Sequence, residues 1–369
     1  MSMYWKIVAL TLLFGVMMPQ EGPKRKYYVV LTTFIHWFVC AFRYQFLTGD
    51  LIKYNTEFRH LRDVGYFSEQ AFQGGRNTGF YWLMKWIGDT TDGDYQMFLI
   101  ILATISVVIA GIFFYRYSPK PWFSYLVWNC LGIYVTYDYL AIKQGLAMAI
   151  LMISMMCIFE KKPFRFLIWT LLAGSIHMPA LCFLPAYFLS TRRLDRNMVL
   201  LYILSAVVIY ASKSQIVAIM GEMYYEDGSF TLVKEQLGGR AIVIILMLAA
   251  GLLLKGFREK QFNQLFHIIV VALIFQLFSG FDNIFTRLAD YYLQFAALYI
   301  PMIFYDARRP QINRLASPPM FPFNRRSRKI LAACIVLVLI WWYETTMLGH
   351  TISYQVDNFL NYRFMWDVK

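Results

Sequence analysis

The chain has 369 residues, of which 59% are hydrophobic and only 15% are charged. Its mean hydropathy of +0.47 exceeds that of an ordinary soluble domain and excludes a water-soluble globular class. The formal charge of +13 lies in short clusters between apolar runs. This pattern orients membrane segments and argues against nucleic-acid binding. Composition therefore predicts a single integral membrane domain over residues 1–369.

Apolar runs of about 20 residues, the length that crosses a bilayer, recur along the chain. We expect helices because backbone groups in lipid must be satisfied within their own segment. The predicted fold class is an all-α polytopic membrane helix bundle with roughly 11 to 12 transmembrane segments. The expected spans lie near residues 3–19, 27–42, 96–115, 121–138, 140–159, 198–219, 240–255, 264–281, 284–305 and 329–348.

One further apolar segment, residues 164–189, has basic clusters on both sides, at residues 161–162 and 192–193. A single crossing would leave these clusters on opposite faces, against the positive-inside rule. A bend at residues 177–179 gives two arms of about 13 residues, roughly 20 Å each, and keeps both clusters inside. We predict a short helical hairpin whose tip places His177 near the outer face, where a polar ring can line a wet cavity.

This topology places the basic loops in the cytoplasm, including the loop over residues 306–329. It leaves a structured loop over residues 43–95 and a tail over residues 349–369 on the extracytoplasmic side. The side chains that could carry chemistry are therefore expected on the outer side.

Three charged residues of the loop 43–95 are candidates. Arg43 directly follows an apolar run, so its side chain either snorkels to the interface or binds an anion. Asp50 follows a glycine and is either a helix N-cap or a functional acid. Arg76 follows two glycines and precedes an aromatic helix that is too short to span the membrane. Glycine N–H groups together with an arginine can bind phosphate, and a plain turn is the alternative interpretation.

Two further cations, Lys143 and Arg287, stand at the outward ends of spans. Ionisable groups in membrane segments are expensive, which favours a functional role. Arg287 shares a helix face with Asp290 and Tyr291, so a local ion pair with Asp290 is the structural alternative.

Metal-binding signals are weak. Asp92 and Asp94 flank a glycine at a spacing that a metal site can use, although a turn is the commoner meaning of such a pair. His36 and His267 have no partner at ligand spacing and are expected to pack inside the bundle. Hydrolase and ATPase motifs do not occur in the sequence. We predict neither a metal nor a cofactor.

Five stretches, in this order, resemble the EpsG family of bacterial polysaccharide-assembly membrane proteins, which is related to Wzy-type repeat-unit polymerases. They are "FRYQFLTGDLIKYNTEF", "NTGFYWLMKWI", "IKQGLAMAILMISMM", "AGSIHMPALCFLPAYFL" and "TRLADYYLQFAALYIP". Two positions depart from the family pattern. Lys143 stands where an arginine is usual, so the charge is kept and the bidentate fork is lost. Asn77 and Thr78 stand where an acidic residue is usual.

The resemblance implies a membrane glycosyltransferase that polymerises undecaprenyl-diphosphate-linked oligosaccharide repeat units. The product would be a capsule, exopolysaccharide or O-antigen, made on the outer face of the bacterial inner membrane. Expected partners are the lipid-linked donor and acceptor and membrane lipid, with a chain-length regulator and a flippase as candidates. Alternatives are a metal-dependent lipid-linked glycosyltransferase, using Asp92 and Asp94, and a flippase or transporter of the same lipid-linked sugar.

With this resemblance, the candidate residues take roles. His177 is the first candidate for general base or for an orienting hydrogen bond, and Asp50 is the second. Arg287 is expected to stabilise the diphosphate as the glycosidic bond breaks. The expected substrate-binding residues are Arg43, Arg76, Asn77, Lys143, Gln144 and Tyr291.

Overall fold

A computed structural model describes residues 3–46, 49–68, 76–224, 238–257, 259–308, 324–348 and 362–367. Within these ranges the regular elements are helices, and an isolated bridge joins Arg43 to Phe364. The predicted all-α fold class is thereby confirmed. Most of the predicted inner loop 306–329 and outer tail 349–369 lies outside the described residues.

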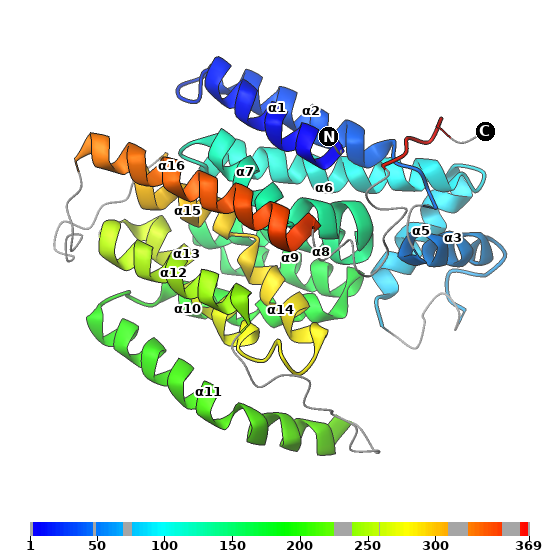
Figure 1. Cartoon of the computed structure of the whole chain (residues 1–369). Coiled ribbons are helices and arrows are strands. Elements are labelled where there is room, and N and C mark those ends of the chain that lie inside the picture. The colour runs from blue at the N-terminus through cyan, green and yellow to red at the C-terminus, as the bar shows by residue number, and fades with distance from the viewer. Residues whose placement is uncertain are drawn as a thin grey trace. The chain divides into compact units, whose positions relative to one another are not determined.

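The chain divides into two compact units (Figure 1). The first, Met1–Leu184 with Lys329–Lys369, contains α1 (Met3–Met17), α2 (Arg25–Ala41), α3 (Gly49–Arg62), α5 (Thr78–Thr90), α6 (Tyr95–Tyr117), α7 (Pro121–Cys130), the π-helix η2 (Tyr134–Leu140), α8 (Ile142–Phe159), α9 (Pro163–Ile176), the 3-10 helix η3 (Met178–Phe183), most of α16 (Arg325–Trp342) and the π-helix η4 (Tyr343–Leu348). The second, Pro185–Arg328, contains α10 (Pro185–Thr191), α11 (Arg196–Tyr224), α12 (Gly239–Leu254), α13 (Lys260–Gln276), α14 (Asn283–Leu293) and α15 (Ala296–Phe304).

Three segments are long and apolar enough to cross a membrane: α6, α8 and Arg196–Val217 of α11. They coincide with the predicted spans 96–115, 140–159 and 198–219. Shorter apolar helices, α1, α9 and α12 among them, accompany them. The chain is therefore a helical membrane protein, and the number of its crossings remains a prediction.

Two predicted spans are not continuous. In the span expected over residues 121–138, α7 ends at Cys130, and Gly132 adopts φ 76°, a left-handed conformation that ends an α-helix readily. A π-helix follows from Tyr134. The span expected over residues 284–305 is split into α14 and α15, because the chain tightens into i to i+3 hydrogen bonds at residues 294–298.

The predicted bend at residue 177 is confirmed. α9 ends at Ile176, and His177 is extended, with φ −145° and ψ 104°. Pro179 stands at the start of η3, where a helix does not need the N–H that proline lacks. The same residue could not continue α9, because it cannot donate a helical hydrogen bond. η3 then packs back against α9. The remainder of the predicted hairpin, α10, belongs to the second unit.

The two core histidines are buried, as predicted, and both form hydrogen bonds. His36 is fully buried, with Nδ1 2.8 Å from the Thr32 carbonyl oxygen and Nε2 2.9 Å from Asn129 Nδ2. His267 is also fully buried, and its Nδ1 lies 2.6 Å from the Tyr202 hydroxyl. Each ring thus has polar partners in an apolar surrounding, which removes the cost of leaving it unsatisfied there.

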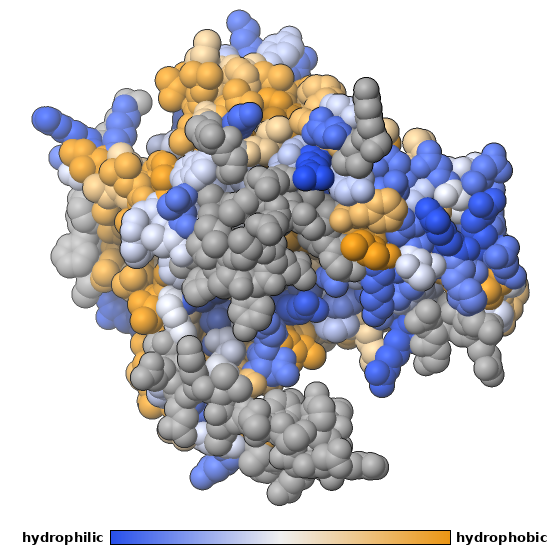
Figure 2. Space-filling view, turned by 45° about the vertical axis from the view of Figure 1, so that its right-hand side comes forward, coloured by the Kyte–Doolittle hydropathy of each residue, from blue (hydrophilic) through white to orange (hydrophobic). Residues whose placement is uncertain are grey.

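Hydrophilic residues gather on the first unit over α3 and α5, on the right of the space-filling view (Figure 2). Apolar side chains remain exposed on the long helices, as on α11, where Val207 and Val208 are 60% and 64% exposed. Such apolar exposure suits lipid rather than water. The polar α3 and α5 therefore stand apart from the apolar spans in surface character.

Candidate functional site

In the described part of the loop 43–95, two helices, α3 and α5, pack against each other. α3 carries Asp50 in its first turn and basic residues in its last, both of which complement the helix dipole. Phe58, on the inward face of α3, has its ring 5.5 Å from Tyr95 and 5.3 Å from Phe98 of α6. These contacts seat α3 on the N-terminal end of α6.

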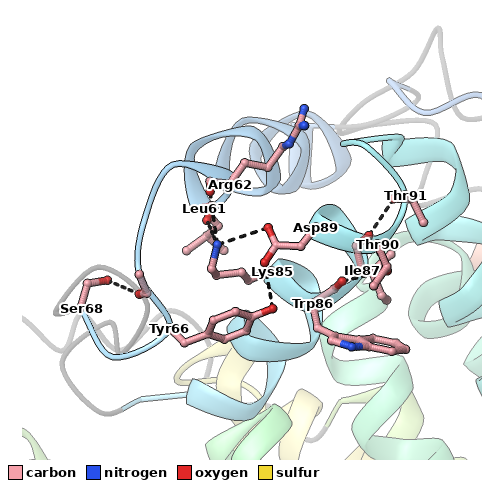
Figure 3. Close-up of polar contacts among 11 residues, drawn as sticks. Leu61, Arg62, Tyr66, Ser68, Lys85, Trp86, Ile87, Asp89, Thr90 and Thr91 are labelled. Atoms are coloured by element: carbon pink, nitrogen blue, oxygen red, sulfur yellow. Dashed lines mark hydrogen bonds and ion pairs between the residues drawn. The ribbon is translucent and has the colours of Figure 1, made fainter.

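A buried lysine joins α5 to the C-terminal end of α3 (Figure 3). Lys85 is 5% exposed and its Nζ donates to the carbonyl oxygens of Leu61 and Arg62, at 3.1 and 3.2 Å, and to Asp89 Oδ1 at 3.3 Å. Tyr66 donates to the other oxygen of Asp89 at 2.8 Å. The ammonium therefore caps α3, whose last carbonyls lack helical partners.

Lys143, at the start of α8, lies among three aromatic rings. Its Nζ is 5.6 Å from the ring centre of Tyr54 on α3, and 5.7 and 5.4 Å from those of Phe80 and Tyr81 on α5. Cations at this distance are attracted to the faces of aromatic rings. The ammonium group of Lys143, which the sequence predicts to bind substrate, is therefore partly enclosed by α3 and α5. Gln144, the next residue, is buried.

Two carboxylates accompany this cation. The charges of Glu57 and Asp50 both act on the Lys143 ammonium. Burial, together with the nearby Glu57 carboxylate, raises the pKa of the Tyr81 phenol to about 12. Oε2 of Glu57 is buried and accepts no hydrogen bond from the described residues. α3 begins at Gly49, so Asp50 lies inside its first turn and not at the predicted N-cap position.

Glu57 is a site residue that the sequence prediction missed. A signal was present, because Asp50, Tyr54 and Glu57 have the i, i+4, i+7 spacing of one helix face. The same spacing occurs on many exposed helices, and only the position of Lys143 gives it meaning here.

Arg43 does not snorkel, contrary to one of its two sequence interpretations. Its side chain is fully buried and folds back on the end of α2, where Nη1 donates to the Cys40 carbonyl oxygen and lies 3.0 Å from Cys40 Sγ. The guanidinium also lies 5.2 Å from the ring centre of Tyr139. Nε and Nη2 find no acceptor among the described residues. Such unpaired buried donors are costly and call for an explanation.

A C-terminal segment, residues 362–367, covers Arg43. Tyr44 N donates to the Arg363 carbonyl oxygen and Met365 N to that of Phe42, both at 2.9 Å. These bonds flank the Arg43–Phe364 bridge. The Tyr362 hydroxyl also donates to the Val39 carbonyl oxygen at 2.9 Å, so a segment more than 300 residues away in sequence packs beside Arg43.

Arg76, Asn77 and His177 lie at one junction. Asn77, in a left-handed conformation before α5, accepts a hydrogen bond from Met178 N on its side-chain oxygen at 2.8 Å. This bond ties the start of α5 to the bend at His177. Arg76 is exposed and His177 is partly exposed. The two glycines that precede Arg76 lie outside the described residues.

Arg287 and Tyr291 belong to α14 in the second unit. Arg287 is exposed, whereas Tyr291 is fully buried. Asp290 forms a bidentate pair with Arg240 of α12, with Nη2–Oδ1 2.7 Å and Nη1–Oδ2 3.2 Å. Asp290, the local partner that the sequence suggests for Arg287, thus has an arginine of another helix as a partner.

Asp92 and Asp94 have turn and cap roles. Asp92 adopts φ 51° in the turn after α5. Asp94 caps α6 by accepting from Gln96 N at 2.8 Å and Met97 N at 3.2 Å. The turn interpretation of this pair is confirmed. Among the residues that the structure describes, no group of three His, Cys, Asp or Glu side chains is arranged to hold a metal ion.

The first unit thus brings several predicted residues together around α5. The Lys143 ammonium lies against rings of α5 and within reach of the charge of Asp50, and Asn77 and His177 lie at the start of α5. The charges of Arg43 and Glu57 both act on Tyr95, at the start of α6, so Arg43 lies in the same region as Glu57. A set of apolar spans that carries charged and aromatic residues at one helix pair is typical of a membrane protein that handles a polar substrate.

Comparison with known families agrees with that class. The profile of the EpsG family matches residues 26–364, so the chain belongs to the EpsG family, a family of Wzy-polymerase type associated with polysaccharide biosynthesis. The protein is therefore a membrane protein of polysaccharide biosynthesis. Comparisons with curated proteins and with solved structures found no match.

Proposed function

We propose that this protein is a glycosyltransferase that joins undecaprenyl-diphosphate-linked oligosaccharide repeat units into a surface polysaccharide. The observation that carries the proposal is Lys143 among the rings of Tyr54 and Tyr81, with the charges of Glu57 and Asp50 acting on its ammonium, in a chain of a polysaccharide-biosynthesis family. Aromatic faces suit sugars, a fixed cation suits a diphosphate, and carboxylates suit sugar hydroxyls.

Cations would stabilise the charge that grows on the leaving diphosphate as the glycosidic bond breaks. We assign this role to Arg43, Arg76, Lys143 and Arg287, with Arg43 supported by its two unpaired buried N–H groups. His177 would orient the acceptor hydroxyl or take its proton. The buried Gln144, next to Lys143 in sequence, and the buried Tyr291, on α14 with Arg287, are also assigned to substrate binding, and Asn77 would hold the bend at His177 in place.

The test is polymerisation by the purified protein. Lipid-linked oligosaccharide extracted from cells that lack this protein is the substrate, and the product is read as a ladder of chain lengths. Wild-type protein is expected to make long chains, and His177→Ala none, at equal protein level. His60→Ala, at an exposed histidine of α3, is the matched control. Wild-type protein that makes no polymer refutes the proposed function, and normal chains from His177→Ala remove His177 from it.

We also propose that the site faces the periplasmic side of the bacterial inner membrane. In a Cys334→Ser background, His177→Cys should react with a membrane-impermeant maleimide in intact spheroplasts. Cys334 is replaced because it is exposed. Labelling that occurs only after the membrane is broken would place residue 177 inside and contradict this topology.

The same assay separates the alternatives. A metal-dependent glycosyltransferase would lose activity in EDTA and in Asp92→Asn, whereas the turn role of Asp92 predicts no loss in either. A flippase would produce no polymer from substrate in detergent solution, where no second leaflet exists.

A further inference from the structure

Glu57 stands apart from the other carboxylates of the site. It lies on α3, is partly buried, and has one oxygen, Oε2, buried without a hydrogen bond from the described residues. Asp50, on the same helix face, is exposed to solvent. A carboxylate oxygen withdrawn from water and left unpaired is a strong acceptor for an approaching hydroxyl group.

The surroundings of Glu57 suit an acceptor sugar. Burial and the negative charge of Glu57 together raise the pKa of the Tyr81 phenol, which lies close to the carboxylate. The rings of Tyr54 and Phe80 flank the neighbouring Lys143 ammonium at 5.6 and 5.7 Å. The charge of Glu57 acts on the Lys143 ammonium. Within the described part of the chain, however, neither side chain lies within ion-pair distance of an opposite charge.

We propose that Glu57 is a catalytic residue, the general base that takes the proton of the acceptor hydroxyl. The inference rests on the proposed polymerase function and leaves the orienting role to His177. The acceptor oxygen bonds to the anomeric carbon of the donor while the bond from that carbon to the diphosphate oxygen breaks. The proton passes to Glu57 and then to water, and undecaprenyl diphosphate leaves with the bonding electrons.

The first test compares kinetic constants in the purified polymerisation assay. Glu57→Gln keeps the shape of the side chain and removes the base, so kcat should fall by about 10²- to 10⁴-fold with little change in KM. Glu57→Asp should retain part of the rate. Asp63→Asn, at an exposed acid just beyond α3, is the matched control and should leave kcat unchanged.

Chemical rescue separates catalysis from structure. Formate added to Glu57→Ala supplies a free carboxylate and should raise its rate at least tenfold, whereas a merely structural role of Glu57 predicts no such rise. Glu57→Gln that keeps more than a third of wild-type kcat overturns the proposal, as does a Glu57→Ala protein, folded by its circular dichroism, that formate does not rescue.

Wild-type protein that makes no polymer refutes the proposed polymerase function, on which this role depends. Wild-type protein that makes polymer, together with a Glu57→Gln protein that keeps more than a third of wild-type kcat, refutes the role of Glu57 alone.

Discussion

Replacing Lys85 by methionine tests whether the α3–α5 pair is held together by one buried ammonium. Methionine keeps most of the apolar stem and removes three donated hydrogen bonds, to Leu61, Arg62 and Asp89, at 3.1 to 3.3 Å. Because Lys85 is only 5% exposed, water does not replace these bonds. The change also leaves the Asp89 carboxylate without its cation.

The size of the effect follows from the geometry. A hydrogen bond to a charged group is worth about 1.5–3 kcal/mol net, and three that share one ammonium are not additive. We expect local opening of α3 and α5 to become easier by about 3 kcal/mol, which is roughly a 100-fold rise in the opening equilibrium. The spans should be unaffected, because Lys85 donates to the loop alone.

Hydrogen exchange followed by mass spectrometry measures this directly. Amides of α3 and α5 should exchange about 100-fold faster in Lys85→Met, and those of α8 at the wild-type rate. Lys53→Met, the same change at an exposed position of α3, should alter exchange less than twofold. Wild-type exchange in α3 and α5 of Lys85→Met would refute the capping role of the ammonium. Equal acceleration in all helices would show a global effect instead of a local one.

Three further changes test other contacts. Asp290→Asn leaves Arg240 without its buried carboxylate, so it should lower the stability of the protein by about 3 kcal/mol and lower its thermal midpoint in detergent. A fall in midpoint no larger than that of a substitution at an exposed position would contradict the ion pair. Asp94→Ala removes the cap of α6 and should lower stability by about 1 kcal/mol in the same measurement. Asp94→Asn keeps a side-chain oxygen that can cap the helix and should have most of the wild-type stability. Gly145→Ala would bring a Cβ to 2.3 Å from the Tyr137 carbonyl oxygen, so it should destabilise by about 1–3 kcal/mol; an unchanged midpoint would disprove the close approach of α8 and η2.

Local features of this protein were readable in its sequence. The membrane class follows from hydropathy, and the break at His177 follows from Pro179, which cannot continue α9. The brevity of the aromatic helix α5 was also predictable. Each of these depends on residues within about one helix length, which is the range over which periodicity and helix-breaking residues act.

Contacts between distant segments were decided by the tertiary structure. Asp290 pairs with Arg240, 50 residues away, although Arg287 stands one helical turn from it in sequence. The backbone at Arg43 pairs with Phe364, and Glu57 gains its surroundings only when α8 brings Lys143 to α3. Hydrophobic periodicity determines which face of a helix is apolar, but the partner that meets a given polar side chain depends on how the helices pack, and that information is spread over the whole chain.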